Sequence, residues 1–95
     1  MVTIRRKQRD AVFRAIADPT RREILRLLRN GRRTVGEIAA NFPTSRPAIS
    51  KHLRLLARAG VLESRRDGYY VLYSLVPDRL AALSATLVAF VRPKR

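Results

Sequence analysis

The sequence contains no cysteine and a single histidine. Disulfide bonds and thiolate metal sites are therefore excluded, and one histidine cannot build a four-coordinate zinc site. Acidic residues are also scarce, with 7 Asp and Glu against 21 Lys and Arg. No apolar run reaches the roughly 18–20 residues that a membrane-spanning helix needs. We therefore expect no cofactor, no metal and no membrane span, and the lack of cysteine fits a cytoplasmic protein.

Basic charge is the dominant property of this 95-residue chain, whose formal net charge is +14. Of the 21 basic residues, 18 are arginine and three are lysine. Arginine makes forked contacts with phosphate and guanine, so this excess predicts a polyanionic partner. An anionic membrane surface fits less well, because the charge is spread along the chain and not gathered on one amphipathic helix. We expect one folded domain over residues 1–95, with 1–6 as a flexible basic arm and 92–95 as a basic tail.

The stretch from Thr44 to Gly60 predicts one helix with two unlike faces. Ser45 is the expected N-cap, and Gly60 is expected to end the helix in a left-handed conformation. The apolar face repeats at helical spacing and consists of Ile49, Leu53, Leu56 and Ala57. The opposite face carries basic and small polar residues and no acid: Arg46, Ser50, Lys51, Arg54 and Arg58. Such a helix can enter a DNA major groove, although charged residues also cover ordinary core helices.

Three shorter helices are expected before this one. The first covers Lys7–Ala17 and the second Pro19–Arg29, with Asp18 as the cap of the second. A third begins near Thr34, because Glu37 follows at the spacing of a capping box, and it ends around residues 41–43. The connection to the next helix is brief, so the third and fourth helices must meet at a sharp angle. That arrangement predicts a helix-turn-helix.

The period of the sequence changes after Gly60. Residues 61–66 and 69–75 predict two strands joined by a tight turn at Asp67-Gly68, which forms a basic hairpin, or wing. A last helix from Pro77 to about Val91 is apolar nearly all round, which predicts a dimer contact unless it is a single central core helix. The expected fold is therefore mainly α with a small β-hairpin wing, a winged helix-turn-helix in the order α-α-α-α-β-β-α.

The candidate DNA contacts fall into three groups. On the fourth helix, short polar and basic side chains near the N-terminus are expected to face bases, and Arg54 is expected to hold phosphate. In the wing, basic and aromatic residues are expected to contact the backbone or the minor groove. Residues near the start of the third helix are phosphate candidates. The full set is Ser45, Arg46, Ser50, Lys51 and Arg54; Arg65, Arg66 and Tyr70; and Arg32, Arg33 and Thr34.

Two segments of the chain resemble the ArsR family of bacterial winged-helix repressors. These are Ala17-Asp18-Pro19-Thr20-Arg21-Arg22-Glu23-Ile24-Leu25 and the segment 45–56 followed by Ala59-Gly60-Val61-Leu62. The resemblance covers roughly residues 10–91. It implies a homodimer built by the first and last helices, which would place two copies of the fourth helix on an inverted-repeat, double-stranded DNA operator. The implied interface residues are Val12, Phe13, Ile16, Leu80, Leu83, Leu87 and Phe90.

The chain departs from the metal-sensing branch of the family it resembles. Residues 34–40 contain no cysteine, and the last helix offers only Asp78 as a metal ligand. The single histidine, His52, is expected to pack between helices or to contact DNA backbone. A metal inducer is therefore not expected, and the sequence leaves open whether a small-molecule inducer, a protein or expression level alone regulates the chain. No pairing of side chains suggests an enzyme. A basic protein that binds nucleic acid with little sequence preference, as a nucleoid-like or RNA-binding protein does, is the main alternative.

Overall fold

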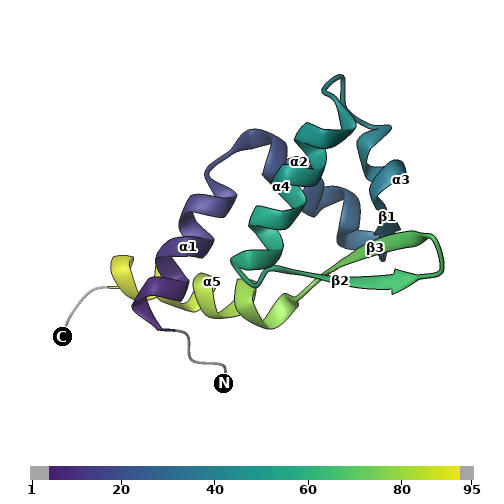
Figure 1. The fold of residues 1–95 in the computed structure, drawn as a ribbon. Helices are drawn as coiled ribbons and strands as arrows, with labels where there is room; N and C mark the ends of the chain where they lie inside the picture. The colour runs from purple at the N-terminus through teal and green to yellow at the C-terminus, as the bar shows by residue number, and fades with distance from the viewer. Residues whose placement is uncertain (1–4, 93–95) are drawn as a thin grey trace.

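A computed structural model describes residues 5–92 and confirms a mainly helical fold with a β-hairpin (Figure 1). Residues 1–4 of the expected basic arm and residues 93–95 of the expected tail lie outside the described range. The helices are α1 (Arg6–Ile16), α2 (Pro19–Leu27), α3 (Val35–Ala39), α4 (Arg46–Arg58) and α5 (Pro77–Val91), with a 3₁₀ turn at Leu28–Asn30. The strands are β1 (Arg33–Thr34), β2 (Leu62–Asp67) and β3 (Tyr70–Leu75).

Three helices begin where their capping residues predict. The Ser45 hydroxyl accepts a hydrogen bond from the Ala48 N–H at 3.3 Å, and the Asp18 carboxylate accepts one from the Arg21 N–H at 3.0 Å. At the start of α3, Thr34 and Glu37 bond each other's backbone N–H groups, which is the expected capping box. Gly60 has φ +85° after α4, as expected of a left-handed helix end.

The sheet differs from the prediction, which had only two strands. Arg33 and Thr34, expected in a loop or at the start of a helix, form β1 and pair with Tyr73 and Leu72 of β3. The sheet is therefore antiparallel in the order β1-β3-β2. A strand of two residues has no alternating pattern to detect, so only the tertiary pairing with β3 defines it.

The hairpin turn also lies one residue later than predicted. Asp67 pairs with Tyr70, so Gly68 and Tyr69 form the loop in place of Asp67 and Gly68. Gly68 has φ +60°, and no residue other than glycine has a positive φ in the described part of the chain. A type I′ turn with Asp67 and Gly68 at its centre would need a positive φ at both residues. The observed turn has a positive φ only at its first central residue, Gly68. This register places Tyr69 at the tip of the wing.

One core joins the helices to the sheet. α4 runs through the middle of the molecule, between α1 on one side and α3 with the hairpin on the other, and α5 runs beneath α1 (Figure 1). The apolar face predicted for α4 is buried, with Ile49, Leu53 and Leu56 each 0% exposed. Burying one such side chain contributes roughly 1.5–3 kcal/mol relative to leaving it in water. The opposite face of α4 is thereby fixed outward.

Acid pH should destabilise the fold through Asp18 and Glu37. The Arg21 backbone N–H lowers the pKa of Asp18 below its ordinary 3.8, and the Thr34 backbone N–H, with help from the Thr34 side chain, lowers the pKa of Glu37 below its ordinary 4.5. A carboxylate with a lowered folded pKa stabilises the protein above its unfolded pKa. That contribution is lost as pH falls through the folded pKa. The melting temperature should therefore begin to fall near pH 4.5 and continue to fall below pH 3.8.

Two replacements of Asp18 distinguish the contribution of its capping hydrogen bond to stability from that of its charge. Asp18→Ala should lower the free energy of unfolding at pH 7 by about 1 kcal/mol, or roughly 4–8 °C in melting temperature. Asp18→Asn is the matched control, because asparagine caps helices about as well but does not titrate. Thermal melts of both variants from pH 3 to pH 7 should show the alanine loss at every pH above 5. An Asn variant with the full wild-type acid dependence would contradict this role for Asp18.

Candidate nucleic-acid interface

The outward face of α4 is basic and lies along one side of the molecule. Lys51, Arg54 and Arg58 are all exposed on it, together with Pro47 in the first turn. Ser50 is half-buried beside them. None of the 7 acidic residues of the chain belongs to α4, so nothing on this helix neutralises its charge. A helix of 13 residues with such a face has the charge and the length to lie in a major groove.

Arg46 extends from the first position of α4 toward α3. Its guanidinium carbon and nitrogens would lie 3.7–3.9 Å from a Cβ atom placed on Gly36, so the group rests beside the first turn of α3. The side chain is nevertheless exposed. The two helices of the predicted helix-turn-helix thus approach each other at Gly36 and Arg46.

Several arginine side chains donate hydrogen bonds to backbone carbonyls of the chain itself. Nε of Arg21 donates to the Ala15 carbonyl at 2.6 Å, and its Nη2 donates to the Arg14 carbonyl at 3.0 Å. Arg22 Nη1 donates to the carbonyls of Ile16 and Ala17, both at 2.9 Å. The last carbonyls of a helix lack partners within the helix, so two arginines of α2 cap the end of α1. This role is not evident in the sequence, because nothing local links residues 21–22 to the end of the preceding helix.

Arg33 serves a similar structural purpose. It is half-buried, and its Nε donates to the Leu27 carbonyl at the end of α2 at 3.1 Å. Arg32, its neighbour in sequence, is exposed. The two arginines, grouped together as phosphate candidates by the sequence, are therefore placed differently by the fold.

His52 packs between helices and does not lie on the outward face of α4. It is half-buried, and its Nδ1 lies 3.3 Å from Nη1 of Arg21, so the tautomer with a bare Nδ1 accepts a hydrogen bond there. Arg21 therefore contacts both the end of α1 and the middle of α4. One guanidinium links the position of α4 to that of α1.

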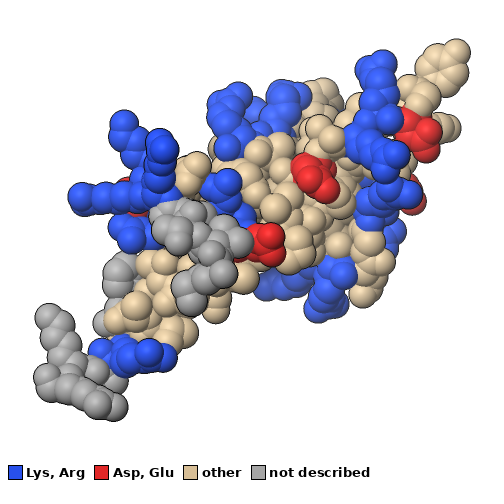
Figure 2. All heavy atoms as spheres, turned by 90° about the horizontal axis from the view of Figure 1, so that it is seen from below, with Lys and Arg blue, Asp and Glu red and all other residues tan. Residues whose placement is uncertain are grey.

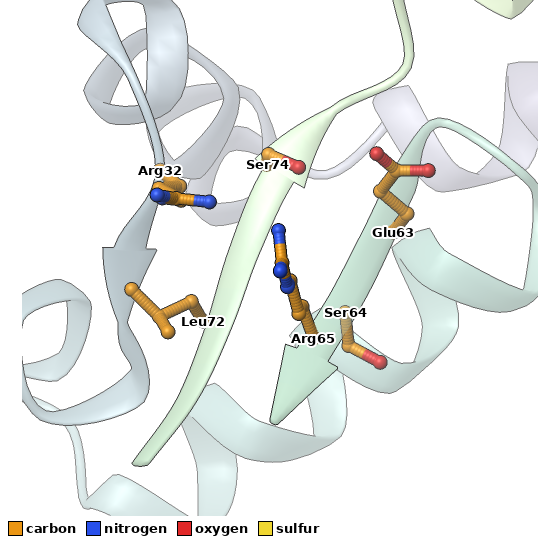
Figure 3. Close-up of a pocket in the computed structure, with 6 residues that line it drawn as sticks. All are labelled: Arg32, Glu63, Ser64, Arg65, Leu72 and Ser74. Atoms are coloured by element: carbon orange, nitrogen blue, oxygen red, sulfur yellow. The ribbon is translucent and has the colours of Figure 1, made fainter. Parts of the chain in front are cut away.

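The predicted DNA contacts of the wing lie on both faces of the hairpin. Successive strand residues point to opposite sides, so Arg65 and Arg66 lie on different faces of the hairpin. Arg65 shares the outer face of the sheet with Leu72, its partner on β3. Figure 3 shows that Arg32 and Arg65 approach β3 from its two sides, around an open pocket of about 300 Å³. The wing tip exposes two aromatic residues, Tyr70 at 63% and Tyr69 at 102%, of which only Tyr70 was a predicted DNA contact.

The expected dimer residues are divided between the core and the surface. Val12 and Leu83, expected at an interface, are 0% and 3% exposed and belong to the core of a single protomer. Phe13, Ile16 and Leu80 are half-buried against that core. The side chain of Phe90 is outside what the structure describes. Large apolar side chains exposed on α5 include Leu87, Val88 and Val91, at 44%, 47% and 81%.

Basic side chains are not confined to α4 and the wing. Figure 2, seen from below, shows lysine and arginine around most of the rim of the molecule, with few acidic residues between them. None of the helices in residues 5–92 is long and apolar enough to cross a membrane. Within the same residues, no three His, Cys, Asp or Glu side chains lie close enough together to hold a metal ion.

Comparison with known proteins defines the class to which this geometry belongs. A helix-turn-helix domain family matches residues 16–65. The transcriptional repressor SdpR of Bacillus subtilis is 52% identical over 64 residues, which cover 67% of this chain and 71% of SdpR. The crystal structure of an ArsR family transcriptional regulator is 30% identical, with a TM-score of 0.84 over 93% of this chain and 91% of the other.

A second solved structure is that of the homodimeric winged helix-turn-helix DNA-binding domain of a possible ArsR-family transcriptional regulator from Mycobacterium bovis. It is 30% identical, with a TM-score of 0.74 over 87% of this chain and 78% of the other. The chain is thus a winged helix-turn-helix DNA-binding protein, and its relatives are transcriptional regulators. It belongs to the ArsR family, as the two resembling segments of its sequence predicted. That family is a class of DNA-binding regulators and not a class of enzymes.

Proposed function

We propose that this chain is a homodimeric repressor that binds an inverted-repeat operator in the cytoplasm. The observation that carries the proposal is the arrangement of three surfaces. In Figure 1, α4 lies centrally, the wing projects at one end, and the C-terminal part of α5 lies toward the other end. The exposed basic residues belong to α4, and the exposed Leu87, Val88 and Val91 belong to that part of α5. A two-fold axis near α5 would keep both wings at the outside and present both copies of α4 to one side of a duplex.

The dimer half of the proposal is supported by α5. A chain of this size hides only part of its unfolded surface, so three exposed apolar side chains on one helix favour burial against a partner. The same helix packs on α1, which would make α1 the second element of the interface. The homodimeric relative from Mycobacterium bovis supports this assembly.

The DNA contacts proposed here form a reading set and a gripping set. The reading set comprises Arg46, Ser50 and Lys51, near the N-terminus of α4. The gripping set holds phosphates through Arg54, Arg32 and the wing residues Arg65, Arg66 and Tyr70. Thr34 and Ser45 use their hydroxyl oxygens to cap helices but keep an O–H that can donate to phosphate. Arg33 also belongs to the gripping set, because only its Nε bonds the Leu27 carbonyl and its Nη groups can donate to phosphate.

Selection of bound duplexes from random DNA by the purified chain tests the function directly. We expect enrichment of an inverted repeat whose half-sites lie one helical turn apart, about 34 Å. The second candidate is a general nucleic-acid coat, which the broad spread of basic side chains in Figure 2 favours. Recovery of no common sequence at near-physiological salt, with affinity that follows salt alone, would establish the coat and reject the repressor.

Operator affinity should not respond to metal ions that bind thiolates. The chain has no cysteine and one histidine, and that histidine lies beside an arginine. We expect zinc, cadmium and arsenite at stoichiometric concentrations to leave the affinity of the dimer for its operator unchanged. A binding titration with each metal checks this, and zinc added to a cysteine-containing family member provides the positive control. Stoichiometric metal binding with release of DNA would refute the prediction.

A further inference from the structure

An open groove between α1 and α4 has the composition of a small-molecule site. Its volume is about 190 Å³. Three apolar residues and three arginines line it. The lining residues are Ala11, Leu55 and Ala59, with Arg14, Arg21 and Arg58. Leu55 is 38% exposed there, although it lies on a helix whose other large apolar residues are buried.

The charges at this groove all have one sign. No acidic residue lines it. All 7 acidic residues lie within residues 5–92, and in this range only Glu23 forms a salt bridge, with Arg26. Asp10 precedes Ala11 and Asp18 lies three residues before Arg21, but within residues 5–92 neither forms a salt bridge, and Asp18 accepts its hydrogen bond from the Arg21 backbone N–H. The guanidinium groups of Arg14 and Arg58 therefore have no carboxylate partner in the described chain.

Arg21 is held in place but retains capacity for an anion. A guanidinium has five N–H donors. Three of them are used on the Ala15 carbonyl, the Arg14 carbonyl and His52 Nδ1. Two remain, and a fixed guanidinium with free donors binds a carboxylate at little entropic cost. Arg21 is thus positioned before any ligand arrives.

We propose that this groove binds a small amphiphilic anion, with a carboxylate on the arginines and a short hydrocarbon body against Leu55. A volume of 190 Å³ corresponds to about six water volumes, which fits a body the size of a benzene ring or a short alkyl chain. Apolar walls with a few convergent charged groups are typical of small-ligand sites. The groove is too small to take more than one side chain of a peptide.

A ligand in the groove should alter DNA binding, because the groove is lined by residues of α4, which carries the proposed base contacts, and by Arg21, which links α4 to α1. Arg21 bonds α1 and reaches α4 through His52, while Leu55 and Arg58 belong to α4. A carboxylate on the free N–H groups of Arg21 would add a contact to the guanidinium that links α1 to His52, and would thereby shift α4 relative to α1. This regulation rests on the proposed repressor function, whereas the binding itself does not. Coupling between two such sites is commonly 5–150-fold, and it is reciprocal.

Calorimetric titration of the purified 95-residue chain, without DNA, tests the site first. The probes are sodium benzoate and sodium hexanoate, and the neutral controls are benzamide and hexanamide. We expect both carboxylates to bind at least tenfold more tightly than their amides. Tighter benzoate would indicate an aromatic ligand and tighter hexanoate an alkyl one, and either result supports the site. Failure of both carboxylates to bind at millimolar concentration, or equal binding of the amides, overturns the proposal.

Two variants connect binding to this groove. Leu55→Glu places a negative charge on the apolar surface, and Arg14→Gln removes one guanidinium; both positions are exposed, so the fold should tolerate them. Each should weaken the carboxylates at least tenfold, while Arg26→Gln on α2 should not change their affinity. If all three variants bind the carboxylates as tightly as wild type, the ligand binds at another site and the assignment to this groove is overturned. An acidic peptide that binds more tightly than either carboxylate, and loses affinity in Leu55→Glu, overturns the ligand class.

DNA titrations at saturating carboxylate then test the coupling. Operator affinity should fall 5–150-fold, with the change abolished in Leu55→Glu. Unchanged operator affinity with a bound carboxylate overturns the regulatory role and leaves the repressor function intact. Loss of sequence preference in the wild-type chain without any ligand rejects the repressor function instead, while the calorimetric result for the groove stands.

Discussion

Leu87→Glu should convert the proposed dimer into monomers and reduce operator affinity by at least about a hundredfold. Leu87 lies in the last third of α5 and is 44% exposed in a single protomer, so its outer part is available to a partner. Moving an unpaired carboxylate into an apolar interface costs several kcal/mol, and about 3 kcal/mol already exceeds a hundredfold in a dissociation constant. A monomer would present only one copy of α4 to the operator.

Light scattering at micromolar concentration measures the first effect and a DNA titration measures the second. Wild type should give twice the 10.8 kDa chain mass, and Leu87→Glu should give the chain mass with a cooperative melt. Leu87→Met is the matched control, because it keeps an apolar side chain of similar volume and should remain dimeric. Leu83→Glu would be a poor choice, since Leu83 is 3% exposed and the charge would disrupt the protomer itself. A wild-type monomer with a normal melt would rule out the dimer.

The distinction between Leu83 and Leu87 shows one limit of reading this sequence. Both residues lie in a helix that is apolar nearly all round, and the sequence assigned both to an interface. Helical spacing shows which residues share a face of α5. It does not show which part of that face is covered by α1 and which part stays exposed. The tertiary contact between α1 and α5 decides that, and it placed Leu83 in the core.

Local chemistry made other features predictable. Asp18, Thr34 and Ser45 each bond a backbone N–H three residues later, so the helix starts could be located from single residues. The helix ends were less accurate: the expected helix to Arg29 stops at Leu27 and continues as a 3₁₀ turn. No cap or proline marks that change, so the sequence carries no signal for it.

The roles of the arginines were the hardest to predict. Arg22 and Arg54 both stand on the exposed surface of a helix, yet Arg22 caps the end of α1, whereas Arg54 has no hydrogen-bond partner among residues 5–92. The acceptors for Arg22 are backbone carbonyls, which every sequence has and which become available only where the fold ends a helix nearby. Composition could therefore predict a polyanionic partner but not which arginines would face it.

The reading and gripping sets should separate when Arg46 and Arg54 are replaced individually. The two residues lie eight positions apart on one helix, or about 12 Å along its axis. Arg46→Ala should cost about 1–3 kcal/mol on the selected operator and relax the preference at one base position in each half-site. Arg54→Ala should weaken operator and scrambled DNA alike and reduce the salt slope by about one per lost contact.

Arg26→Ala supplies the matched charge control for both. Arg26 lies on α2, and its Nη1 bonds the Glu23 carboxylate at 2.8 Å. The substitution therefore removes one positive charge without removing a proposed DNA contact. We expect its affinity for both duplexes to stay close to that of wild type. Titrations of the three variants on operator and scrambled duplex, each at several salt concentrations, measure these differences.

The comparison distinguishes a reading helix from a merely basic one. If α4 only supplies charge, every variant should lower affinity for both duplexes by a similar factor, and Arg26→Ala should match the other two. If α4 reads bases, the loss in Arg46→Ala must be larger on the operator than on scrambled DNA. The loss in Arg54→Ala must then be equal on both. Arg46 rests beside Gly36 in the free protein, so its guanidinium must also leave α3 to reach a base. Gly36→Ala should leave that movement possible, because its Cβ would meet the guanidinium at an ordinary 3.7 Å, and it should therefore retain wild-type preference on the operator.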